Sequence, residues 1–333
     1  RSRGLGDVYK RQEYYIYYNS MSTQDLEKRR PTMVKKLVLL VVGVLMAALF
    51  AGCGNDAPKE QAGKKIQVVT SFNAMSEFAK AIGGDKVEVS TIIPDGTEPH
   101  DFELKPENMK QLASAQVFVY NGLGMEPWAQ QAIDAAKNDK LVSVKASDGV
   151  EAIKNTDPDE IKEHGAEDPH TWLSLKNAKI EVKNIKDALV KVDPTNKDYY
   201  EKNYNDYVAK LDAMIQKYEG QFAKAPHKNF VTGHAAFAYL CRDFGLEQNS
   251  VEDVFAEGEP NAAQLAKLIE YCKENKITTI FAEEMASPEV SKTLAQEVGA
   301  KVETIYTIES KEDDKTYLER MDDNLTKILG SLQ

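Results

Sequence analysis

Five histidines occur in the 333-residue sequence, and three of them stand where they could bind a metal ion. His100 and His234 each follow an expected strand, and His170 lies in an expected turn before a helix. In open α/β sheets ligands bind beyond the carboxyl ends of strands, and imidazole is the commonest ligand for borderline metals. The three side chains could therefore share one site. Each alone could equally be a hydrogen-bonded residue near a turn, which is how we interpret His164 and His227 in their charged loops.

Short apolar runs alternate with amphipathic stretches from residue 65 onward, as in parallel sheets built from βαβ units. The expected strands are 66–72, 87–93, 117–121 and 141–144, then 230–232, 251–255, 278–281 and 302–306. The expected helices are 74–82, 106–115 and 127–137, then 235–244, 261–275, 288–298 and 317–332. We therefore predict an α/β fold of two βα lobes with parallel four-stranded sheets.

A long helical segment is expected between the lobes, at 177–225, with a break at Asp193-Pro194. After the proline, apolar residues recur at helical spacing and predict one buried stripe. A helix of that length would span about 45 Å, which is more than one lobe, so we expect a rigid connection. The predicted domains are an N-terminal lobe (65–176), connecting helices (177–225) and a C-terminal lobe (226–333).

The first part of the chain is typical of an exported protein. Two lysines precede an apolar run at 37–52, which is shorter than the ~20 residues of a membrane span and is typical of a signal peptide. Its end resembles a bacterial lipobox before Cys53, with Phe50 where leucine is usual; an ordinary signal peptide with an incidental cysteine is the alternative. We interpret 1–32 as upstream of the true start at Met33 (or Met21), 33–52 as the signal, and 53–64 as the lipidated cysteine and its polar tether.

Charge and cysteine content exclude two classes of protein. The formal net charge is −11, and residues 1–52 are basic, so the remainder is still more acidic and does not suit nucleic-acid binding. Three cysteines are too few for a disulfide scaffold. Cys241 and Cys272 lie in helical patterns, and we expect buried free thiols there, with a disulfide as the alternative.

Several motifs together resemble one known family. They are PHDF at 99–102, NGLGMEPW at 121–128, DPHTWL at 168–173, GHAAFAYL at 233–240 and EPN at 259–261. With them, residues 65–333 resemble the metal-binding solute-binding lipoproteins of ABC-type zinc/manganese importers, the zinc- and manganese-binding adhesin-like cluster.

The resemblance implies two lobes with one metal ion between them. Its four metal ligands correspond to His100, His170, His234 and Glu309, the last following the final strand. The family's manganese importers tend to carry a carboxylate in the third position. Three imidazoles and one carboxylate favour Zn²⁺ as the bound ion, with Mn²⁺ as the alternative.

Three further carboxylates are weaker candidates for the fourth ligand: Glu98, Glu283 and Glu284. Glu283 also suits a residue that orients a metal-bound histidine. The implied protein is not an enzyme. It is a monomer outside the cytoplasm, anchored to the membrane by lipid on Cys53, without nucleic acid, and delivers its metal to an ABC transporter permease.

Other functions remain open from the sequence. They are a manganese or iron receptor of the same family, a metal-dependent surface adhesin, and a zinc hydrolase that uses three histidines and an activated water. The hydrolase would need Glu309 not to coordinate and a general base such as Glu283. The sequence carries no H-E-x-x-H motif to support it.

Overall fold

The computed structural model describes residues 64–155, 161, 165–254, 261–283 and 288–333. These residues belong to one compact unit, Gly63–Gln333. The predicted upstream segment (1–32), the signal peptide (33–52) and the lipidated Cys53 lie outside the described residues. Within the described part of the chain, no helix is both long enough and apolar enough to cross a membrane.

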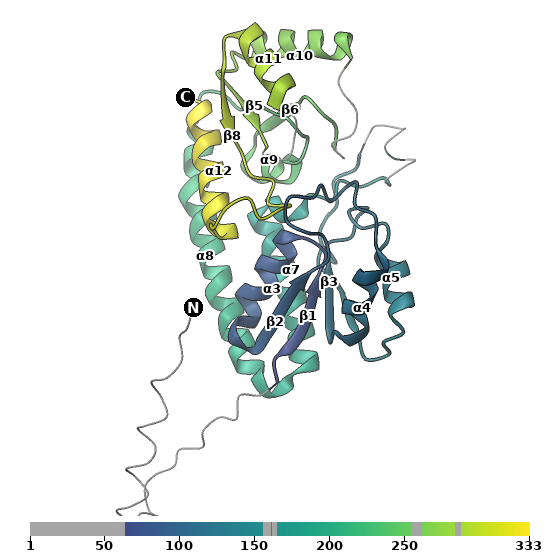
Figure 1. The fold of residues 1–333 in the computed structure, drawn as a ribbon. Coiled ribbons are helices and arrows are strands. Elements are labelled where there is room, and N and C mark those ends of the chain that lie inside the picture. Colours follow the sequence, from purple (N-terminus) through teal and green to yellow (C-terminus); the bar gives the residue numbers. More distant parts are fainter. Residues whose placement is uncertain (1–63, 156–160, 162–164, 255–260, 284–287) are drawn as a thin grey trace, which may run out of the picture. The chain divides into compact units, whose positions relative to one another are not determined.

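The N-terminal lobe is built on a four-stranded, fully parallel sheet in the order β2-β1-β3-β4 (Figure 1). Its strands are β1 (Ile66–Thr70), β2 (Val87–Thr91), β3 (Val117–Tyr120) and β4 (Val142–Lys145), and its helices are α3 (Asn73–Gly83), α4 (Pro106–Ser114) and α5 (Ala129–Ala136). Valine and phenylalanine side chains of the central strands β1 and β3 are buried, as expected for a sheet covered on both faces.

The C-terminal lobe repeats this plan with the sheet order β6-β5-β7-β8, again parallel throughout. Its strands are β5 (Asn229–Thr232), β6 (Glu247–Ser250), β7 (Thr279–Ala282) and β8 (Lys301–Thr304), and its helices are α9 (Ala238–Phe244), α10 (Ala262–Glu274), α11 (Pro288–Val298) and α12 (Tyr317–Ser331). The prediction of an α/β fold with two parallel four-stranded sheets is therefore confirmed.

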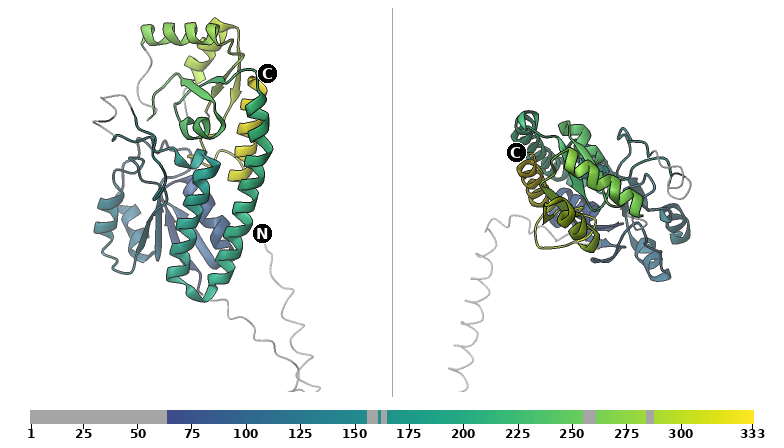
Figure 2. Two further views of the ribbon diagram at one scale, coloured as in Figure 1. Left: turned by 180° about the vertical axis from the view of Figure 1, so that it is seen from behind. Right: turned by 90° about the horizontal axis from the view of Figure 1, so that it is seen from above.

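Two antiparallel helices connect the lobes, α7 (Leu175–Val192) and α8 (Lys197–Lys224), separated by the expected break at Asp193-Pro194 (Figure 2). The hydroxyl of Ser174 caps the start of α7 by accepting the Asn177 backbone N–H. Helix α8 packs against α7 and contacts α3 of the first lobe and α9 and α12 of the second. Its buried stripe comprises Tyr200, Tyr207, Leu211, Tyr218 and Phe222. One helix thus packs against both lobes.

One strand prediction was wrong, and a helix start was misplaced by three residues. The strand expected at 251–255 lies instead at Glu247–Ser250, a polar segment that pairs only with β5 at the sheet edge. Helix α9 begins at Ala238 rather than 235, because Gln248 donates to the His234 carbonyl and accepts the Phe237 backbone N–H. These side-chain hydrogen bonds hold residues 234–237 out of the helix.

The core is continuous across the connection between the lobes. One buried apolar cluster includes Phe72 of the first lobe, Trp172, Phe222 of α8 and Ile305 of the second lobe. A smaller cluster, which includes Cys272, fills the space among α10, α11 and the second sheet. Cys241 and Cys272 are buried free thiols, as expected.

Candidate metal centre

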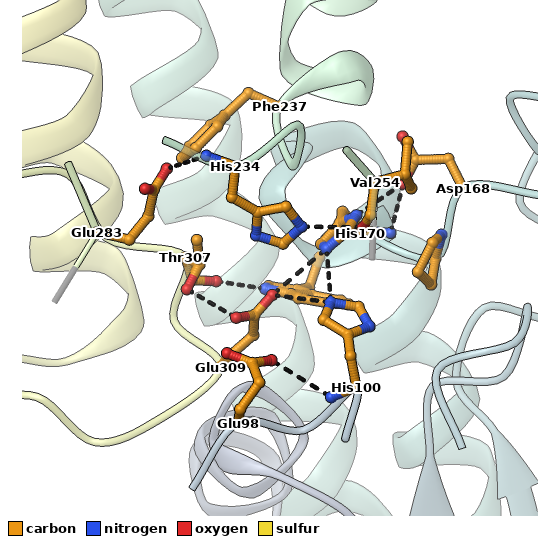
Figure 3. Close-up of polar contacts among 12 residues, drawn as sticks. Glu98, His100, Asp168, His170, His234, Phe237, Val254, Glu283, Thr307 and Glu309 are labelled. Carbon is orange, nitrogen blue, oxygen red and sulfur yellow. Dashed lines mark hydrogen bonds and ion pairs between the residues drawn. The ribbon is translucent and has the colours of Figure 1, made fainter. Parts of the chain in front are cut away.

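Four of the predicted site residues come together in the structure. His100 lies in the segment after β2, His170 before α7, His234 after β5 and Glu309 after β8 (Figure 3). Each offers one nitrogen or oxygen atom, and these atoms lie within 4.8 Å of one another. The segments that follow parallel strands meet at one edge of each sheet, which is where a ligand is expected.

The donor atoms face one another at short range. His100 Nε2 lies 3.2 Å from His170 Nε2, and Glu309 Oε1 lies 3.4 Å from His170 Nε2 and 3.7 Å from His100 Nε2. The ring centroids of His170 and His234 are 4.7 Å apart. All four side chains are buried. The arrangement concentrates imidazole nitrogens and one carboxylate in a buried space, and a cation would stabilise it.

His170 is oriented by Asp168. The buried Asp168 carboxylate accepts hydrogen bonds at 2.9 Å from both Nδ1 and the backbone N–H of His170. Nε2 is therefore directed at the other histidines. Burial alone would lower the pKa of His170, but hydrogen bonds and charge from Asp168 and Glu309 raise it to about 9. At this pKa the imidazole carries a proton at neutral pH, and a cation that bound there would have to displace it.

His234 is held at its backbone and at its ring. Glu283 Oε1 accepts the His234 backbone N–H at 3.2 Å, and Glu283 Oε2 lies so close to Gly233 that a Cβ there would meet it at 2.3 Å and displace the carboxylate. His234 Nε2 lies 2.9 Å from the Val254 carbonyl, which only accepts, so Nε2 carries the proton and Nδ1 the lone pair. Burial and the nearby His170 lower the pKa of His234 to about 3.

Glu309 lies in a buried segment after β8 that is tied to the first lobe. The Asn73 backbone N–H donates to the Glu309 carbonyl at 3.2 Å, and Trp172 Nε1 donates to the Thr307 carbonyl at 2.7 Å. Burial alone would raise the pKa of Glu309, but the His100 and His170 rings hold it well below its usual range. Glu309 is therefore an anionic donor.

Two of the three weaker carboxylate candidates, Glu98 and Glu283, lie outside this group of four. Glu98 Oε1 accepts the His100 backbone N–H at 3.3 Å, and burial together with Glu309 raises the pKa of Glu98 to about 8. Burial likewise raises the pKa of Glu283 to about 8. Both carboxyls are mainly neutral at pH 7, which leaves Glu309 as the anionic carboxylate among these three. Glu284 lies outside the described residues.

Two histidines, His164 and His227, were not expected to bind a metal. His227 belongs to the loop before β5, where its backbone N–H donates to the Leu332 carbonyl, and it is not part of the group. His164 lies outside the described residues.

Sequence reasoning missed three residues that shape the site. Asp168 precedes His170 by two positions in a turn, so the DPH motif could have predicted its hydrogen bond to the His170 ring. Val254 contributes only a backbone carbonyl, and Thr307 a hydroxyl in a segment of irregular backbone. Neither Val254 nor Thr307 has a pattern in the sequence that would have indicated its part.

The donor set fits a borderline divalent cation. Three imidazole nitrogens and one carboxylate oxygen are the ligand types of four-coordinate Zn²⁺ sites. When all four bind, no protein-provided position stays open for a reacting water, which suits binding better than catalysis.

Comparison with known proteins supports the same interpretation. The family model of the periplasmic zinc-uptake complex component A, ZnuA, matches residues 68–330. The high-affinity zinc uptake system protein ZnuA of Bacillus subtilis is 41% identical over 319 residues, which cover 90% of this chain and 99% of that protein.

Solved structures share the fold. A Zn(II)-bound variant of AdcAII from Streptococcus pneumoniae has a TM-score of 0.74 and 33% identity, covering 81% of this chain and 100% of that one. The laminin-binding protein Lmb of Streptococcus agalactiae, described as having adhesin and metal-transporting activity, has a TM-score of 0.74 and 32% identity with the same coverage. With the family model matching nearly the whole of the described unit, the chain belongs to the ZnuA family of zinc-uptake components.

Proposed function

We propose that this protein is an extracytoplasmic receptor that binds one Zn²⁺ ion through His100, His170, His234 and Glu309 and delivers it to an ABC transporter permease. The observation that carries the proposal is the buried convergence of these four donors within 4.8 Å. Zinc is the cargo of the protein and not a catalytic cofactor.

The choice of zinc over manganese depends on the ligand types. Imidazole suits Zn²⁺, whereas Mn²⁺ prefers oxygen-rich octahedral shells. Three of the four donors here are nitrogens, and the two further carboxyls nearby, Glu98 and Glu283, have raised pKa values. The names of the Bacillus subtilis and Streptococcus pneumoniae relatives support the same ion.

A hydrolase is disfavoured by the place of its expected general base. Glu283 accepts the backbone N–H of His234 with one oxygen, and its other oxygen lies against Gly233. This carboxyl supports the backbone of His234, as expected for a residue that orients a metal-bound histidine, and it is not one of the four converging donors.

The lipobox supports membrane attachment. In this proposal the signal peptide at 33–52 is removed and lipid on Cys53 anchors a monomer whose tether ends at residue 64. The N-terminal lobe then comprises 65–176, the connecting helices 177–225 and the C-terminal lobe 226–333. The receptor reaches the permease while it stays attached to the membrane.

Replacing one ligand should remove most of the zinc affinity. We expect His234→Ala to weaken Zn²⁺ binding by about 100-fold or more, since ~10–16 kcal/mol shared among four ligands is about 3 kcal/mol each. The measurement is competition with a zinc-chelating fluorophore on the purified protein. His227→Ala, a histidine outside the group of four, should bind like the wild type. Equal losses in both variants would contradict the ligand assignment.

Zinc affinity should rise with pH up to about 9 and then level off. The metal needs neutral His170, whose pKa is raised to about 9, so the proton must leave at any lower pH. Each pH unit below that value should cost about tenfold in affinity. Competition titrations in zinc buffers from pH 6.5 to 9.5 measure this. Asp168→Asn removes the carboxylate that holds the proton and should move the plateau to lower pH. A flat profile in the wild type between pH 7 and 9 would rule out this proton competition.

Cys53→Ala should release the protein from the membrane. The thiol that carries the lipid is removed, so labelled fatty acid should enter the wild-type protein in cells but not the variant. The variant should appear in the soluble fraction after cell lysis. Cys272→Ala, which changes a buried thiol of the C-terminal lobe, should be labelled normally. Labelling of Cys53→Ala would exclude Cys53 as the lipid site.

A further inference from the structure

The two carboxylate oxygens of Glu309 have different surroundings. Oε2 accepts a hydrogen bond from the Thr307 hydroxyl at 3.0 Å, in a fully buried environment. Oε1 faces Nε2 of His170 at 3.4 Å and Nε2 of His100 at 3.7 Å. One oxygen is therefore already engaged by the protein, and the other is directed at the histidines (Figure 3).

The backbone around Glu309 leaves the carboxylate little freedom to change this arrangement. The carbonyls on either side of Ile308 are fixed from the first lobe, by Trp172 at Thr307 and by Asn73 at Glu309. Ile308 itself has φ of 60°, in the left-handed region that β-branched residues rarely adopt, at a cost of about 1–3 kcal/mol. Its side chain is fully buried, so packing offsets this strain.

The position of Thr307 follows from the same contacts. Its carbonyl accepts Trp172 Nε1 at 2.7 Å, and its side chain is 1% exposed, so water does not compete for the hydroxyl. A hydrogen bond from a hydroxyl to an ionised carboxylate is stronger than a neutral one, and a buried carboxylate oxygen without a donor is costly. The hydroxyl is thus held on Oε2.

We propose that Thr307 determines metal specificity: its hydroxyl engages Oε2 of Glu309, so that Glu309 offers a metal ion one oxygen and the site stays four-coordinate. The inference rests on the proposed function, because it concerns how the same site selects its cargo. Zn²⁺ is satisfied by four tetrahedral ligands, whereas Mn²⁺ prefers six oxygen-rich ones. A carboxylate restricted to one oxygen penalises Mn²⁺ more than Zn²⁺.

The test compares Thr307→Val, which removes the hydroxyl at nearly constant shape, with Thr307→Ser, which keeps it. Competition titrations with Zn²⁺ and with Mn²⁺ give the ratio of the two dissociation constants for each purified protein. We expect Thr307→Val to reduce the preference for zinc by about tenfold or more, mainly through tighter Mn²⁺ binding. Thr307→Ser should keep the wild-type ratio. Circular dichroism and thermal unfolding show whether each variant is folded.

Each outcome bears on the proposal. An unchanged ratio in Thr307→Val, or equal weakening for both metals, would overturn it, since a purely structural role lowers both affinities together. If Thr307→Val does not fold, Thr307→Ala applies the same criterion without the added methyl group. A crystal structure of the zinc-bound wild type gives a second criterion: both Glu309 oxygens on the metal would overturn the inference. Failure of the wild type to bind Zn²⁺ would instead overturn the proposed function.

Discussion

The structure depends on one electrostatic constraint, which is that three imidazoles and one carboxylate are buried together with no lysine or arginine paired to them among the described residues. An ionised carboxylate in a protein interior costs several kcal/mol unless it is paired. Here the partners of Glu309 are imidazoles, and among the described residues no lysine or arginine forms an ion pair with it within 4 Å. The raised pKa of His170 is the sign of this imbalance, because its proton supplies the positive charge that the site lacks. A divalent metal ion would replace that proton and engage all four donors.

The fold makes this concentration of donors possible. Each of the four donors lies in a segment after a strand or before a helix, outside the regular backbone hydrogen bonding, so its side chain is free to turn toward the others. Helix α8 contacts elements of both lobes, and Asn73 and Trp172 of the first lobe hold the Glu309 segment of the second. The four donors come from distant parts of the chain, and contacts between the protein's own residues bring them together.

The sequence was sufficient to predict most of the fold and the four donors that the structure brings together, for identifiable reasons. Apolar strands such as β3 and the proline between α7 and α8 are strong local signals. The three histidines were readable because histidine is scarce and each stands at a loop next to a regular element; the choice of Glu309 came from family resemblance.

The features of the fold and the site that the sequence did not predict are those fixed by long-range or backbone contacts. Strand β6 is polar, and its position is fixed by its pairing with β5. The apolar residue Val251, which follows the strand, led to the wrong prediction of a strand at 251–255. The delayed start of α9 depends on Gln248, ten residues beyond the first residue of that helix. The Val254 carbonyl and the positive φ of Ile308 act through the backbone, which residue types alone do not specify.

The most direct test of the central claim is X-ray absorption at the zinc edge on the zinc-loaded protein. The account predicts four light-atom ligands at about 2.0–2.1 Å with the multiple scattering of three imidazoles. The His234→Ala variant, loaded at high zinc concentration, should lose one imidazole. A shell with a sulfur ligand, with six ligands, or with fewer than three imidazoles in the wild type would contradict the account.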